Sequence, residues 1–100
     1  MNQMQQLMMQ AQKMQRELAK AQAELESKVF STSKNGMVKI TVLGTKEVQS
    51  IDIEKDALEP DNKEMIEEAI KMALQELFEQ IDEEAEEINN RIGAKMPLGF

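Results

Sequence analysis

Apolar residues recur every three or four positions along two long stretches of the chain, which is the spacing of an amphipathic helix. In residues 1–28 no Gly or Pro interrupts the repeat, and the apolar positions form a seam of Met4, Leu7, Ala11, Met14, Leu18, Ala21 and Leu25. The predicted helix is about 40 Å long, whereas a compact domain of this length is roughly 26 Å across. It must therefore lie along another long element or project from the body.

Residues 61–92 predict a second long helix. Its seam positions are again three or four apart: Ile66, Ile70, Ala73, Leu77, Ile81, Ala85 (or Glu84), Ile88 and Ile92. Asp61 followed by Glu64 predicts an N-terminal capping pair. Arg91 in the last turn and Gly93 just beyond it match the polarity of a helix C-terminus. This second helix is available as the partner of the first.

Residues 29–53 predict a three-stranded β-meander between the two helices. After a first strand at 29–33, Asn35-Gly36 is a strong signal for a hairpin turn. Residues 37–43 then alternate apolar and polar side chains, so one face of that strand is expected to be buried. In residues 48–53 the apolar side chains break strict alternation, which predicts a β-bulge.

The chain is therefore predicted to be a single α+β domain, residues 1–100, in the order α-β-β-β-α with a short irregular tail at 93–100. A three-stranded sheet between longer helices leaves an open edge, and such edges are usually covered or paired with another chain. The core must be filled largely by nine Met and only three Phe, so burial through self-association would add stability. We expect a dimer built across the sheet.

Composition excludes several classes of function. The chain has no His and no Cys, which removes the usual general base and the thiol nucleophile, and its serines have no evident activating partner. The glutamates of residues 83–87 fix no coordination number, and no Gly-rich phosphate loop is present. We expect no enzyme, metal, cofactor or small-molecule substrate. Without Cys, an apolar run of about 18 residues or a signal sequence, we also expect a cytoplasmic protein with no membrane role.

The net charge of −7 is unevenly distributed. Residues 1–60 carry eight Lys or Arg against eight Asp or Glu, whereas residues 61–100 carry four against eleven. Five carboxylates fall within residues 82–87, and a run of this kind is expected to be a solvated helix face. The excess acid therefore belongs to the second helix.

Three cations on the first helix form the candidate binding surface. Lys13, Arg16 and Lys20 are spaced three and four apart on the face turned away from the seam, so they can contact one strip of phosphates. We call these three residues the basic stripe. The alternative is that they are solvated surface residues without a ligand. Weaker candidates elsewhere in the chain are Lys34, Lys39, Lys46 and Lys95.

Several segments in order resemble the YbaB/EbfC family of nucleoid-associated proteins. The run LMMQAQKMQRELAKAQAELE (7–26) is similar to the opening helix of that family, and GMVKITVLG (36–44) with VQSIDI (48–53) is similar to its central strands. DNKEMIEEAI (61–70) and MPLGF (96–100) extend the resemblance over nearly the whole chain.

The resemblance implies a bacterial nucleoid protein that binds double-stranded DNA as a homodimer, with projecting helices that hold the duplex. DNA would meet the basic stripe, with little sequence specificity. The sheet would form the dimer contact through Val38, Ile40, Val42, Val48 and Ile51. The resemblance also suggests partners among replication or recombination proteins.

The sequence departs from the family pattern at two points. Met9 stands where relatives often carry Lys, and the second helix is unusually acidic. With three phosphate contacts per subunit, a dimer would still make about six, giving a slope of log affinity against log salt near about −5. Binding at physiological salt is therefore expected to be modest.

A second interpretation is a dimeric protein-interaction module that acts with replication or recombination proteins without strong DNA binding of its own. Methionines beside the seams suit grooves that accept helices of several kinds; these are Met1, Met8, Met9, Met65 and Met72. The simpler alternative is that they pack one helix against the other.

Overall fold

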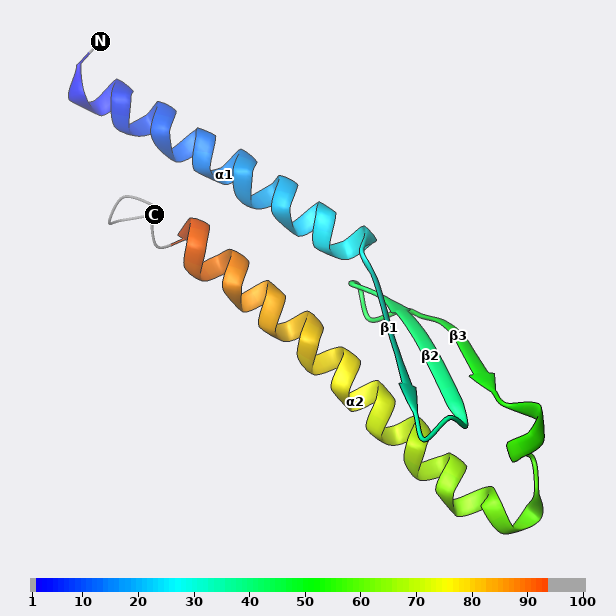
Figure 1. Ribbon diagram of the computed structural model, residues 1–100. Coiled ribbons are helices and arrows are strands. Elements are labelled where there is room, and N and C mark those ends of the chain that lie inside the picture. The colour runs from blue at the N-terminus through cyan, green and yellow to red at the C-terminus, as the bar shows by residue number, and fades with distance from the viewer. Residues whose placement is uncertain (1, 94–100) are drawn as a thin grey trace.

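The computed structural model describes residues 2–93 and has the predicted α-β-β-β-α order (Figure 1). Helix α1 (Gln3–Ser27) leads into strands β1 (Val29–Lys34), β2 (Val38–Leu43) and β3 (Val48–Ile53). Two short 3-10 turns, η1 (Lys55–Ala57) and η2 (Pro60–Asn62), connect the sheet to α2 (Lys63–Ile88), which continues as a π-helical turn, η3 (Asn89–Gly93). Of the predicted tail at 93–100, Gly93 belongs to η3, and residues 94–100 lie outside the described residues.

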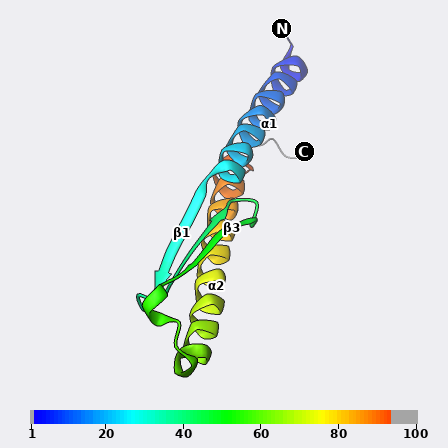
Figure 2. The ribbon, with the colours of Figure 1, turned by 90° about the vertical axis from the view of Figure 1, so that its right-hand side faces the viewer.

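The subunit is a rod and not a globule. Its principal extents are 71 × 18 × 14 Å and its radius of gyration is 20.1 Å, against roughly 13 Å for a compact chain of this length. The sheet lies along one part of α2, while α1 lies along the other end of α2 and continues past it (Figures 1 and 2). The first helix therefore both packs against a long element and projects from the body.

The strands form an antiparallel sheet in the order β1-β2-β3. Asn35 and Gly36 have φ angles of 56° and 65°, the left-handed values that this class of tight hairpin turn requires. The predicted bulge is confirmed, because Thr41 is opposite Ser50 and Val42 is opposite Val48, which leaves Gln49 as the extra residue.

The main core lies between one face of the sheet and α2. Val38, Ile40 and Val42 point from β2 toward α2, where Ala73 and Leu77 are fully buried. The core also contains Phe30, Ala57, Ile66, Ala69 and Ile81. The predicted burial of one face of β2 is confirmed, and the element that covers this face is α2.

The start of α2 differs from the prediction. The α-helix begins at Lys63, two residues late, and Asp61 lies in η2 and does not cap it. The side-chain amide of Asn62, at the cap position, donates to the carbonyl of Ala57 at 3.0 Å and makes no capping bond. Pro60 begins a 3-10 turn that leads directly into α2. Asp61 is therefore inside this turn and not at the N-cap position.

The capping box is found at α1 instead. The backbone N–H of Gln5 donates to Oδ1 of Asn2 at 2.8 Å, and the backbone N–H of Asn2 donates to Oε1 of Gln5 at 3.3 Å. Two otherwise unpaired backbone donors are satisfied in this way. The first turn of α1 is thus closed locally.

Gly44 fixes the junction between α1 and the sheet. Its backbone N–H donates to the carbonyl of Lys28 at 2.9 Å. A Cβ atom at this position would lie 1.7 Å from the carbonyl oxygen of Leu25, far inside van der Waals contact. Only glycine allows the end of β2 to approach the last turn of α1 so closely.

Candidate nucleic-acid interface

The basic stripe lies on the free face of α1. Lys13, Arg16 and Lys20 are all exposed, as the helical spacing predicted. Within residues 2–93 none of the three forms an ion pair. The stripe covers about 10 Å along the helix axis. Its geometry therefore presents three uncommitted cations on one surface; whether they contact DNA stays a prediction.

The lysines next to the sheet are engaged differently. Lys34 pairs with Glu76, and Lys46 pairs with Asp82 at 2.8 Å. The Lys46 ammonium also lies 5.7 Å from the ring centroid of Phe78. Two of the weaker candidate cations are thus used inside the subunit. Of the other two, Lys39 is exposed on β2 and Lys95 lies outside the described residues.

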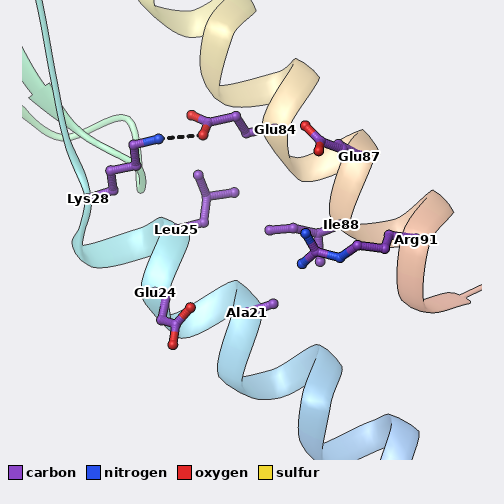
Figure 3. A pocket seen from close by; sticks show the side chains of 8 residues that line it. All are labelled: Ala21, Glu24, Leu25, Lys28, Glu84, Glu87, Ile88 and Arg91. Atoms are coloured by element: carbon purple, nitrogen blue, oxygen red, sulfur yellow. Dashed lines mark hydrogen bonds and ion pairs between the residues drawn. The ribbon is translucent and has the colours of Figure 1, made fainter.

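A third ion pair joins the end of α1 to α2. Lys28 pairs with Glu84 (Figure 3), and its ammonium lies 5.1 Å from the ring centroid of Phe30. Together the three pairs connect Lys28, at the end of α1, and Lys34 and Lys46, in the β-meander, to α2. Attraction between partly exposed charges is individually weak, but all three pairs involve α2.

One of these pairs changes the acidity of its carboxyl group. The hydrogen bond and charge of Lys34 hold the pKa of Glu76 below its ordinary value of 4.5, with desolvation opposing part of the effect. The hydroxyl of Thr32 also donates to Glu76, at 3.3 Å. Glu76 is therefore held as a carboxylate by two residues of β1.

Most of the acidic run of residues 82–87 is the solvated face that was predicted, because Asp82, Glu83, Glu86 and Glu87 are exposed and Glu84 is half-buried. Two of these carboxylates also form ion pairs, Asp82 with Lys46 and Glu84 with Lys28. The partners lie 36 and 56 positions away in sequence, so no local pattern could have identified them. Some of the excess carboxylates in residues 61–100 thus form ion pairs within the fold.

A cavity of about 230 Å³ lies between the last turns of α1 and residues 84–91 (Figure 3). Its lining mixes both charge signs with apolar side chains: Ala21, Glu24, Leu25, Lys28, Glu84, Glu87, Ile88 and Arg91. The Arg91 side chain extends alongside Ile88 toward α1. Within residues 2–93 no three His, Cys, Asp or Glu side chains are grouped as metal ligands. No helix in that part of the chain is long and apolar enough to cross a bilayer.

The structure divides the predicted dimer residues into two groups. Val38, Ile40 and Val42 are at most 2% exposed and face α2 of the same subunit, so their side chains are already committed to the core. Val48 and Ile51 are 42% and 47% exposed. They share the core face of the sheet with their cross-strand partners, yet α2 packs mainly on β1 and β2.

The methionines beside the seams are about half exposed within this chain, so whether they pack one helix against another stays a prediction. Met8, Met9, Met65 and Met72 are 47–54% exposed, and Met4 is 70% exposed. Met4 belongs to the seam of α1, and the other four lie beside the seams. Met1 lies outside the described residues.

The described part of the chain is therefore an α-β-β-β-α rod whose projecting first helix exposes three cations in a row. Residues 1–96 match the YbaB/EbfC DNA-binding family. The chain belongs to this family, as the order of its motifs predicted. It is a DNA-binding family of nucleoid-associated proteins and not an enzyme family.

Individual relatives support the assignment. The chain is 40% identical over 97 residues to a nucleoid-associated protein of Clostridium novyi, covering 94% of this chain and 85% of that one. It is 38% identical over 96 residues to a nucleoid-associated protein of Neisseria meningitidis, covering 93% and 86%. The crystal structure of the uncharacterized protein HP0035 from Helicobacter pylori shares the fold, with a TM-score of 0.67 at 18% identity over 80% of this chain and 85% of that one.

Proposed function

We propose that the protein acts in the nucleoid and binds double-stranded DNA as a homodimer through the basic stripe of α1. The observation that carries this proposal is the contrast between two sets of cations. Lys28, Lys34 and Lys46 are paired inside the subunit, whereas the basic stripe is exposed and unpaired within residues 2–93. Phosphate contacts position a protein without reading bases, so little sequence specificity is expected.

The acidic helix restricts how DNA approaches. Exposed carboxylates of α2, such as Glu83, Glu86 and Glu87, repel phosphates. Packed helices lie about 8–10 Å apart, close to the screening length of about 8 Å at physiological salt. The duplex therefore approaches the outer face of α1, with α2 on the far side.

The homodimer is supported by the uncovered part of the sheet. Val48 and Ile51 expose apolar surface on the core side, next to the free backbone edge of β3. A second copy placed there would cover both side chains and the edge together. Val38, Ile40 and Val42 hold β2 in place from inside the subunit. Two basic stripes would then be displayed by one assembly.

The test is an anisotropy titration of a labelled 30-base-pair duplex at several salt concentrations. The triple variant Lys13→Gln, Arg16→Gln, Lys20→Gln is compared with the matched control Lys55→Gln, Lys63→Gln, Lys71→Gln, whose sites are exposed and lie outside α1. Both variants lose three charges per subunit. We expect a slope of log affinity against log salt near about −5 in the wild type and the control, because six phosphate contacts remain.

The stripe variant should lose most of its affinity and of its salt dependence. Equal losses in the two variants would overturn the assignment to α1. Sedimentation and circular dichroism confirm that each variant keeps its assembly state and helix content, so that a folding defect is not mistaken for lost contacts.

A second candidate function is the protein-interaction module that acts with replication or recombination proteins. The exposed methionines favour it, because unbranched, polarizable side chains adapt to varied apolar partners. If the wild type fails to bind the duplex even at low salt, this function becomes the leading one. A purified partner would then be retained by the wild type and released by Met65→Lys or Met72→Lys.

A further inference from the structure

Helix α1 continues beyond the point where α2 ends. Ala11 on α1 is 3% exposed and Ile92 in η3 is 7% exposed, and these two elements are in contact. Further toward the N-terminus the same seam is open, with Met4 at 70% and Leu7 at 49% exposure. We call residues 3–10 the overhang; it is the blue end of the rod in Figures 1 and 2.

The overhang is helical from its first residue. Its first turn is closed by the reciprocal bonds between Asn2 and Gln5, and it continues without interruption into the packed part of α1. All eight residues are exposed in the part of the chain that the structure describes, and an isolated helix of this length is marginally stable in water. A partner that covers Met4 and Leu7 would stabilise the overhang.

The overhang also differs from the rest of the chain in charge. Residues 1–12 contain no ionisable side chain, although 31% of the whole chain is charged and the net charge is −7. Two overhangs can therefore meet without repulsion between their side chains. The acidic face of α2 could not pair with its own copy in this way, because like charges would face one another.

We propose that the overhangs of two copies pair with each other, antiparallel and seam to seam, with Met4 of one copy opposite Leu7 of the other. Steric exclusion selects this direction. From Ala11 onward α2 occupies the seam side of α1, so a parallel pair would force the two α2 helices into the same space. In the antiparallel pair each overhang continues the line of the other copy's α2.

The antiparallel arrangement also keeps the acidic regions apart. Each subunit is 71 Å long, and joining two of them by their tips places the α2 acids of the two copies mostly beyond the screening length of about 8 Å. The contact is distinct from the proposed one at β3, which lies on the body of the rod. Together the two contacts would link dimers end to end.

The size of the contact predicts that it is weak. An overlap of eight residues is about 12 Å long, which is too short to bury the roughly 1,200 Å² of a stable interface. The association should therefore depend on protein concentration in solution. Copies held side by side on one duplex would experience a much higher effective concentration, so the pairing suits cooperative coating or bridging of DNA.

The test measures mass without DNA, so it is independent of DNA binding. Sedimentation of the wild type over a range of concentrations should show growth beyond the basic assembly, with little dependence on salt. Leu7→Glu places a charge in the seam and should weaken this growth at least tenfold. The matched control Gln6→Glu adds the same charge beside the seam and should behave as the wild type.

Two results would overturn the proposal. One is a wild type of constant mass, or equal behaviour of Leu7→Glu and Gln6→Glu. The other is a lower melting temperature of Leu7→Glu at unchanged mass, because the seam would then be covered within one subunit. The comparison of the two variants holds whether the basic assembly is a monomer or a dimer, so failure here is distinguishable from failure of the β3 contact.

The absence of cysteine allows a direct test of direction. Under oxidation, a mixture of Met4→Cys and Leu7→Cys chains should cross-link severalfold faster than either variant alone, because the two positions face each other across the antiparallel pair. If Leu7→Cys alone cross-links fastest, the helices are parallel and the proposed arrangement is wrong.

Discussion

The two long helices are nearly equal in length, 25 residues in α1 and 26 in α2, and both repeat apolar residues every three or four positions. Their surroundings are nevertheless very different. Five residues of α2 are buried, and in α1 only Ala11 is. A helical repeat therefore predicts that a helix has an apolar face, but it does not predict which elements cover that face or whether it is buried.

The charges of the two helices differ in the same way. Carboxylates of α2 bind lysines at the sheet side through Glu76, Asp82 and Glu84, so charge on α2 helps to assemble the subunit. The cations of the basic stripe are unpaired within the described residues. Charge on α2 is therefore used within the chain, whereas the basic stripe of α1 is the surface proposed to bind DNA.

The largest expected effect is on the free energy of unfolding, and it distinguishes the buried apolar side of α2 from the exposed apolar side of α1. Leu77→Ala removes a side chain with 0% exposure from the centre of the core, and the cavity should lower the free energy of unfolding by about 3 kcal/mol. Leu7→Ala, at 49% exposure, should cost less than about 0.5 kcal/mol in dilute protein. Urea denaturation measures both, and similar losses would contradict this distinction.

A smaller effect is expected where α1 joins the sheet. Gly44→Ala forces a methyl group against the carbonyl of Leu25 and should lower the free energy of unfolding by about 2 kcal/mol, the usual scale of overpacking. Amide exchange should increase first at the last turn of α1. Gly93→Ala is the matched control because the space around it is open; an equal loss there would refute the steric explanation.

Elements with a local signal could be predicted from the sequence. Asn35-Gly36 identified the hairpin because both residues tolerate positive φ, and the broken alternation around Gln49 identified the bulge. The helical spacing also placed Lys13, Arg16 and Lys20 on the exposed side of α1. Each of these features depends on residues close together in the chain.

Features that depend on tertiary placement could not be predicted. Val42 and Val48 are paired across β2 and β3 and are chemically identical, yet one is 0% and the other 42% exposed. The difference arises because α2 packs on β1 and β2, which no strand pattern reveals. The ion pair of Lys28 with Glu84 likewise connects residues 56 positions apart.

The smallest expected effect tests whether α2 carboxylates fasten the sheet. Because the folded-state pKa of Glu76 is lowered, its pairing with Lys34 stabilises the fold above the ordinary value of 4.5 and loses this contribution as the pH falls below it. Glu76→Gln should therefore be less stable than the wild type at neutral pH, and the difference should vanish in acid.

The effect is small because the Lys34 and Glu76 side chains are 27% and 38% exposed, so water screens much of their attraction. Urea midpoints measured from neutral pH to well below 4.5 resolve it, with Glu79→Gln as the matched control on the exposed surface of the same helix. If Glu79→Gln gives the same pH dependence, general charge reduction explains the result. If only Glu76→Gln loses the pH-dependent stability, the ion pair of Glu76 with Lys34 stabilises the fold. Some of the negative charge on α2, which disfavours DNA binding, would then serve to hold the sheet against the helix.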